Sequence, residues 1–169
     1  MRSRPTQPVR TVRWQLRTLL LLAFIGFAAA RPAAAADVVV WSDITLLDGR
    51  VLRAAELNSK TVVVQMWASW CPFCMRQNPH IQKLHEQAGD RLVVLGLSIA
   101  KDPATESEYM KKRGYSFAAA MAPRQTEQWF GKRRTLPEVY VIAPGGKVVF
   151  REGGEMFPED IAGLIRFAK

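Results

Sequence analysis

Two short runs near the middle of the chain are apolar at almost every position. Thr61 to Trp67 (TVVVQMW) and Leu92 to Ile99 (LVVLGLSI) are rich in β-branched and aliphatic residues, without a polar residue at every second position. Strands of this kind are buried on both faces, as in the centre of a sheet that helices cover. Between them we expect a helix from Cys71 to about Gln87, with Gly89 as its stop. The pattern predicts a β–α–β unit at the centre of the fold.

Further elements are expected on both sides of this unit. They are a hairpin within Val38 to Leu52 around Asp48-Gly49, a helix from Asp102-Pro103 to Gly114 with Glu106 and Glu108 early in it, a short strand at Phe117 to Met121, a short helix at Thr126 to Phe130, a hairpin of Glu138 to Ile142 with Lys147 to Arg151, and a last helix from about Pro158. Strand–helix alternation closed by a hairpin and a helix predicts an α/β sandwich with a mixed sheet. Residues 37–169 suit one domain with a single core.

The first 36 residues have a different character. An arginine-rich start without acids is followed by the apolar stretch Leu19 to Ala30 and then by Ala34-Ala35-Ala36. This is the order of a secretory signal peptide, cleaved before Asp37. The apolar stretch is short for a membrane span, which needs roughly 20 residues, so a retained N-terminal anchor is the alternative. Both interpretations predict that the domain is exported, with the cleaved form in the periplasm.

The leader also explains most of the positive charge. The chain carries a formal net charge of +9, with 24 basic and 15 acidic residues. Six of the basic residues are arginines of the first 36 residues, so the rest of the chain has 18 basic and 15 acidic residues, or +3. A nucleic-acid partner is therefore not needed to explain the charge, and we expect none.

Cys71 and Cys74 are the only cysteines of the chain. A Cys-x-x-Cys pair on the first turn of a helix, directly after a buried strand, is typical of a dithiol redox site. Free N–H groups and the helix dipole at this end favour the thiolate of Cys71, and Pro72 suits the first helical position. We predict that Cys71 is the attacking thiolate and that Cys74, one turn further and buried, is the resolving thiol.

Two structural roles for the pair fit less well. A disulfide closing so short a loop removes little entropy from the unfolded chain. A structural zinc site needs four ligands, and the histidines, His80 and His85, lie five residues apart and so not on one helix face. We expect no metal, and no cofactor other than the redox-active disulfide itself.

Three further motifs accompany the pair. Met66 to Cys74 is similar to the pattern F-W-A-x-W-C-x-x-C, and Pro79 falls where a kink is expected in the same helix. Thr135 to Ile142 resembles G-x-P-x-x-F-x-I, and Gly145 to Val149 resembles a hairpin of the type D-x-x-G-x-I/V. On these motifs the chain resembles the thioredoxin superfamily and, within it, the exported TlpA/ResA/DsbE-like thiol–disulfide oxidoreductases. The resemblance implies a three-layer sandwich and a cis proline at Pro137 that faces the dithiol.

The resemblance also assigns roles to residues around the dithiol. Trp70, Pro72, Phe73, Leu136 and Pro137 would contact the substrate, whose chain the cis-proline loop would hold by backbone hydrogen bonds.

Two positions depart from the relatives, because Gln65 and Gln77 stand where some of them carry acids. Neither amide can exchange a proton, so Glu138 is the remaining candidate for proton transfer to Cys74. The alternative for Glu138 is an ordinary exposed acid at the end of a strand.

The resemblance thus implies a monomeric protein-disulfide reductase outside the cytoplasm. Its partners would be proteins with disulfides, such as apocytochrome c or copper-site proteins, and a membrane-embedded electron donor. The alternatives are an oxidase or isomerase that uses the same residues, or a Cu(I) carrier that binds metal through the two sulfurs, with Met75 as a further ligand. Lys132-Arg133-Arg134 would either attract an acidic partner or form a solvated loop.

Overall fold

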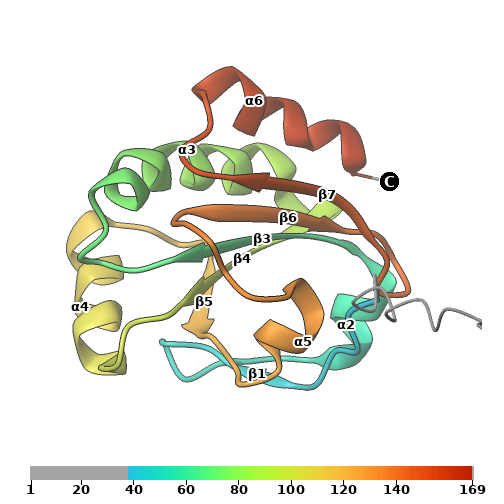
Figure 1. Cartoon of the computed structure of the whole chain (residues 1–169), viewed down its shortest axis with the longest axis horizontal. Coiled ribbons are helices and arrows are strands. Elements are labelled where there is room, and N and C mark those ends of the chain that lie inside the picture. The colour runs from blue at the N-terminus through green and yellow to red at the C-terminus, as the bar shows by residue number, and fades with distance from the viewer. Residues whose placement is uncertain (1–37, 169) are drawn as a thin grey trace, which may run out of the picture. The chain divides into compact units, whose positions relative to one another are not determined.

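The computed structural model describes residues 38–168, so the predicted signal peptide and its cleavage site lie outside the described residues. A five-stranded sheet forms the middle layer (Figure 1). Its order is β5 (Ala118–Met121), β4 (Leu92–Ser98), β3 (Thr61–Trp67), β6 (Glu138–Ile142) and β7 (Val148–Gly153). β3, β4 and β5 are parallel, whereas β6 is antiparallel to β3 and β7 is antiparallel to β6. The predicted mixed sheet is confirmed.

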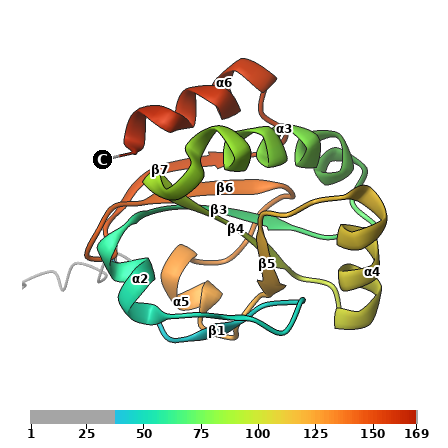
Figure 2. The ribbon, with the colours of Figure 1, turned by 180° about the vertical axis from the view of Figure 1, so that it is seen from behind.

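Helices cover both faces of the sheet. α3 (Pro72–Ala88) and α6 (Pro158–Gly163) lie on one face, and α2 (Ala54–Ser59) and α5 (Thr126–Phe130) lie on the other (Figures 1 and 2). The small hairpin of β1 (Ile44–Thr45) and β2 (Val51–Leu52) is on the side of α2 and α5. The predicted three-layer sandwich with an N-terminal hairpin is therefore confirmed.

The apolar run of β3 is buried on both faces because its side chains alternate between two cores. Val63 and Trp67 pack into the core beneath α3, together with Cys74. Val62, Val64 and Met66 pack into the second core, on the side of α5. All seven residues of β3 are buried, as the absence of polar alternation predicts.

The helix of the dithiol and the next helix start and stop at the expected residues. Cys71 is the N-cap of α3, Pro72 is its first residue, and Pro79 lies inside it. α4 (Pro103–Arg113) is capped by Asp102, whose carboxylate accepts hydrogen bonds from the backbone N–H groups of Ala104 and Thr105. Gly114 ends α4 with a φ of 69°, a left-handed conformation that favours glycine.

Other boundaries differ slightly from the sequence-based expectations. α2 was not predicted, β7 extends to Gly153, and the last helix continues as a 3-10 turn, η2 (Leu164–Phe167), while η1 (Gly89–Arg91) follows α3. Within residues 38–168 there is no helix long and apolar enough to cross a membrane.

Candidate active site

The two cysteines lie at the start of α3, where the chain leaves the end of β3. They form a disulfide, with Cα atoms 5.2 Å apart. The side chain of Cys71 is 3% exposed, and Cys74 is fully buried. The backbone N–H of Cys74 donates a hydrogen bond to the Cys71 sulfur at 3.2 Å. The partly positive hydrogen of this N–H group stabilises negative charge on the sulfur, so the local geometry favours a thiolate at Cys71.

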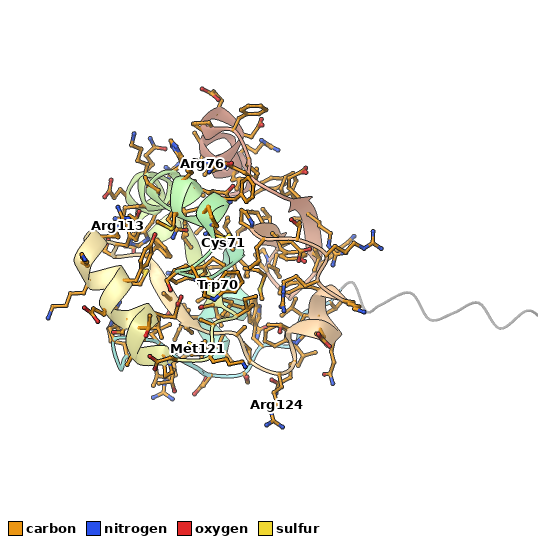
Figure 3. All side chains as sticks on the ribbon, turned by 60° about the vertical axis from the view of Figure 1, so that its left-hand side comes forward. Trp70, Cys71, Arg76, Arg113, Met121 and Arg124 are labelled. Carbon is orange, nitrogen blue, oxygen red and sulfur yellow. A yellow bond between two sulfur atoms is a disulfide. The ribbon has the colours of Figure 1, made fainter. Side chains whose placement is uncertain are left out.

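Aromatic side chains border the dithiol on the surface. Trp70 is 63% exposed and Phe73 is 51% exposed, which is unusual for rings of this size. The guanidinium group of Arg76 lies over the Phe73 ring, 4.7 Å from its centre, and forms an ion pair with Glu155 at 2.6 Å. Trp70, Cys71 and Arg76 follow one another along the face shown in Figure 3. The ion pair fixes the orientation of Arg76 over the ring, and hydrogen bonds from Arg76 lower the pKa of the Glu155 carboxyl group.

The proline loop lies at the same edge of the sheet. The Leu136–Pro137 peptide bond is cis, which confirms the expectation for Pro137. Met66 pairs with Glu138 across β3 and β6, so the loop before β6 lies beside the end of β3, which leads to Cys71. The structure thus brings the two predicted halves of the site, the Cys-x-x-Cys turn and the cis-proline loop, to one end of neighbouring strands.

Glu138 is not the exposed acid of the alternative interpretation, because its side chain is only 7% exposed. Its carboxylate accepts hydrogen bonds from the backbone N–H of Arg134 at 3.1 Å and from the Tyr140 hydroxyl at 2.7 Å. Burial, together with the bond to Glu138, raises the pKa of the Tyr140 phenol. Tyr140 belongs to the core on the α5 side, whereas Cys74 belongs to the core beneath α3. The structure therefore does not bring the Glu138 carboxylate together with Cys74.

Amides replace acids in the core next to Cys74. Gln65, Gln77 and Asn78 are at most 1% exposed. The Gln77 side-chain N–H donates to the Gln65 oxygen at 2.8 Å, and Gln65 donates to the Asn78 oxygen at 2.6 Å. The Gln77 oxygen accepts from the backbone N–H of Met156 at 2.7 Å. These amides satisfy one another's buried polar atoms without a carboxylate.

The basic cluster Lys132-Arg133-Arg134 belongs to a groove that residues of α5 and β7 also line. The groove has a volume of about 650 Å³, and Arg151 is one of its β7 residues. The residues that line this groove include none of the predicted site residues. Among residues 38–168 there is also no group of three or more His, Cys, Asp or Glu side chains that could hold a metal ion.

Comparison with known proteins identifies the family. The model of the Redoxin family matches residues 32–164, which is most of the chain. The chain belongs to the Redoxin family. It is similar to the thiol-disulfide oxidoreductase ResA of Bacillus anthracis, with 23% identity over 124 residues that cover 73% of this chain and 72% of the relative. It is also similar to a thiol:disulfide interchange protein DsbE homolog of Paracoccus denitrificans, with 28% identity over 117 residues, 68% of this chain and 63% of the relative.

Solved structures agree on the fold. A thiol:disulfide interchange protein of the thioredoxin family from Chlorobium tepidum matches with a TM-score of 0.70 and 23% identity, over 83% of this chain and 99% of that structure. The predicted fold and superfamily are therefore confirmed, and this Redoxin member is a TlpA/ResA/DsbE-like thiol–disulfide oxidoreductase.

One residue beside the dithiol loop escaped the sequence analysis. Glu106 was noted only as an early acid of a helix, where it complements the dipole. In the structure its side chain is fully buried and its carboxylate accepts hydrogen bonds from Ser69 and Ser98. The sequence carries no signal for this burial, because it arises from the packing of α4 against the end of β3.

Proposed function

We propose that this protein is an exported protein-disulfide reductase that works by thiol–disulfide exchange. The observation that carries the exchange mechanism is the asymmetry of the pair, and the reductive direction rests on Pro72-Phe73, which offer no polar group to favour a strongly oxidising thiolate. Cys71 is the N-cap of α3, accepts a hydrogen bond from the Cys74 N–H and is 3% exposed, whereas Cys74 lies inside the helix with no exposed surface. A nucleophile needs a stabilised thiolate and access to its target, and Cys71 meets both requirements better than Cys74.

The reaction follows from these roles. The thiolate of reduced Cys71 attacks one sulfur of a substrate disulfide, and the other substrate sulfur leaves as a thiolate and takes up a proton. Cys74 then loses its proton and attacks the Cys71 sulfur. The mixed disulfide breaks, the second substrate sulfur leaves, and the Cys71–Cys74 disulfide forms. Two electrons have passed from the protein to the substrate, which departs as a dithiol.

The surroundings of the pair suit a protein substrate. The exposed rings of Trp70 and Phe73 offer apolar contact area beside the sulfurs. Pro72 is exposed on the same turn, and Leu136 and Pro137 lie on the neighbouring loop. An extended substrate segment would lie between the ring of Trp70 and the cis-proline loop, with its disulfide over Cys71.

A reductase outside the cytoplasm needs electrons from another compartment. The arginine-rich, apolar leader supports export, and a membrane-embedded donor would return the Cys71–Cys74 disulfide to the dithiol by the same exchange run in reverse. Cysteine pairs of apocytochrome c and of copper-site proteins are the substrates that the resemblance favours.

Trapping of the mixed disulfide tests the assigned roles. The variant Cys74→Ser keeps the attacking thiolate but lacks the thiol that resolves the adduct. Mixed with proteins of the exported compartment, it should accumulate covalent adducts that disappear on addition of a reductant. The matched control Cys71→Ser should trap far less, because the Cys74 sulfur has no exposed surface and does not accept the N–H hydrogen bond that stabilises the Cys71 thiolate. Equal trapping by both variants would contradict the roles.

A redox titration tests the direction of electron transfer between the protein and its substrate. The Cys71–Cys74 pair should equilibrate with glutathione at a reduction potential close to that of thioredoxin, about −270 mV. A potential near −120 mV, the value of a strong disulfide oxidant, would instead support the oxidase alternative. If neither cysteine variant traps a protein and the reduced wild type binds Cu(I) tightly, the carrier alternative takes the place of the reductase.

A further inference from the structure

Glu106 lies in the first turn of α4, and its side chain has no exposed surface. Glutamate is rarely buried to this extent unless partners satisfy its carboxylate. Here the backbone N–H of Ser69 donates to Oε2 at 3.1 Å, the Ser69 hydroxyl donates to Oε1, and the Ser98 hydroxyl donates to Oε2 at 2.8 Å. Three donated hydrogens match an ionised carboxylate, which only accepts hydrogen bonds.

The groups that Glu106 binds belong to the turn that presents the dithiol. The backbone N–H of Cys71 donates to the Ala68 carbonyl at 3.2 Å, which closes a four-residue turn after β3. Ser69 is the second residue of this turn, and both its N–H and its hydroxyl are held by Glu106. Trp70, the exposed ring beside the disulfide, is the third residue. The carboxylate therefore fixes the turn from its buried side.

The same carboxylate connects this turn to the neighbouring strand. Ser98 is the last residue of β4, pairs with Trp67 at the end of β3, and accepts a hydrogen bond from the Ala100 N–H at 3.1 Å. Glu106 thus joins the turn after β3 to the carboxyl end of β4.

We propose that Glu106 is a positioning residue of the dithiol, which holds the Ala68–Cys71 turn and whose negative charge keeps the Cys71–Cys74 pair reducing. The proposal deepens the proposed reductase function and rests on it for its biological meaning. A fixed negative charge disfavours the Cys71 thiolate, and the thiolate occurs only in the reduced protein. The charge therefore favours the disulfide form, so the dithiol gives up its electrons more readily.

The size of this effect follows from the length of the turn. Ser69 and Cys71 are two residues apart, so their Cα atoms are separated by at most about 7.6 Å, which puts the carboxylate on the order of 10 Å from the Cys71 sulfur. At an effective dielectric constant of about 20, two unit charges at this separation change an ionisation equilibrium by about tenfold.

The variant Glu106→Gln separates charge from shape. Its oxygen can still accept from Ser69, and its N–H group can donate to the Ser98 hydroxyl oxygen. The pH at which Cys71 reacts half-maximally with iodoacetamide should fall by about one unit. At a pH above the Cys71 pKa of both proteins, the equilibrium constant with glutathione should shift by about tenfold towards the reduced protein.

Two further variants serve as controls. Glu108→Gln removes an exposed charge from the same helix and should leave both measurements within about twofold of the wild type. Glu106→Asp keeps the charge, so both of its measured values should lie closer to those of the wild type than the values of Glu106→Gln do. If Glu106→Gln folds and both measurements match the wild type, the electrostatic role is wrong, because a purely structural residue would give that result.

If Glu106→Gln does not fold, Ser69→Ala tests the mechanical role. This variant removes one hydroxyl donor while the carboxylate remains, so hydrogen exchange of the Cys71 amide should become faster. An unchanged exchange rate would show that Glu106 does not hold the Ala68–Cys71 turn. These results are separable from the proposed function. If Cys74→Ser forms adducts but Glu106→Gln leaves the Cys71 reactivity and the redox equilibrium unchanged, only the role of Glu106 is refuted. If Glu106→Gln shifts both measurements but Cys74→Ser forms no adducts, the reductase is refuted and the effect of Glu106 on the dithiol stands.

Discussion

Replacing Gln77 by Glu places an ionisable group in the buried amide chain next to Cys74. Gln77 is 1% exposed, donates to the Gln65 oxygen and accepts from the Met156 N–H. A protonated carboxyl group preserves both bonds, because its O–H donates and its C=O accepts. An ionised carboxylate has no hydrogen to donate and loses its hydration in the core. We therefore expect the variant Gln77→Glu to be tolerated in acid and to be costly at neutral pH.

The cost follows from the shift of the new carboxyl pKa. Burial of an acid raises its pKa by up to about 3–5 units. For the Glu at position 77 we assume a modest rise of about 2 units from the unfolded value of about 4.3. Between these two pH values the folded state holds more protons than the unfolded state, so stability falls as pH rises. At about 1.36 kcal/mol per unit, the variant should lose roughly 2.5 kcal/mol relative to the wild type between pH 4 and pH 7.

Urea unfolding of the oxidised proteins at several pH values measures this difference, since disulfide-bonded cysteines do not titrate. Gln87→Glu, at an exposed position of the same helix, is the matched control and should show little pH dependence relative to the wild type. A free-energy difference for Gln77→Glu that is equal at pH 4 and pH 7 would show that the Gln77 site is not the dry, neutral environment that the structure describes.

Two other substitutions test the fold around the site. In Gly96→Ala the new methyl group would lie 2.8 Å from Trp67 Nε1 and 2.9 Å from a Phe117 ring carbon, so urea unfolding should show a loss of about 1–3 kcal/mol. Asp102→Ala removes the cap of α4 and should lower stability at neutral pH. Hydrogen bonds, first of all from Thr105, lower the pKa of Asp102, so its contribution is present above the unfolded value and is lost as pH falls through the folded one. The difference in urea midpoint between the two proteins should therefore shrink as pH falls below the unfolded pKa of an aspartate, about 3.9.

The elements that sequence reasoning located are those with strong local signals. β3 was predicted because an apolar run without alternation fits a strand buried on both faces, and its residues do divide between two cores. α4 was predicted from Asp102-Pro103 and Gly114, and the cap and the left-handed stop are both present. The start of α3 at the cysteines follows in the same way from Pro72 and from the strand before it.

α2 was missed because its start signal is not local. Its N-cap residue is Arg53, which makes no side-chain capping bond. The hydrogen-bond acceptor for its first N–H group is the Asp43 carboxylate, eleven residues earlier in the chain and also paired with Arg53. Leu57 is the buried residue of this short helix. A capping group that arrives through tertiary contact leaves no pattern in the window where a helix is sought.

The contrast between local signals and tertiary contacts also explains why the roles of two acids, Glu138 and Glu106, do not follow from the sequence. Glu138 and Glu106 both follow signals that the sequence shows, a strand start and a helix start, but their roles depend on which layer each side chain enters. Side chains alternate along β6, so Glu138 points with Tyr140 into the core on the α5 side, away from the core of Cys74. Glu106 instead packs under the turn before Cys71.

The distribution of charge around the dithiol has a consequence for its chemistry. Near Cys74 the buried groups are the amides of Gln65 and Gln77, which cannot exchange a proton, while the buried carboxylate of Glu106 is bound to the turn of Cys71. A proton that leaves Cys74 must therefore pass to water or to a substrate sulfur. The substrate thiolate released in the first step is a suitable acceptor, because it forms beside the pair at the moment when Cys74 has to ionise. On this argument, resolution of the mixed disulfide depends on the basicity of the substrate thiolate released in the first step more than on any carboxylate of the protein.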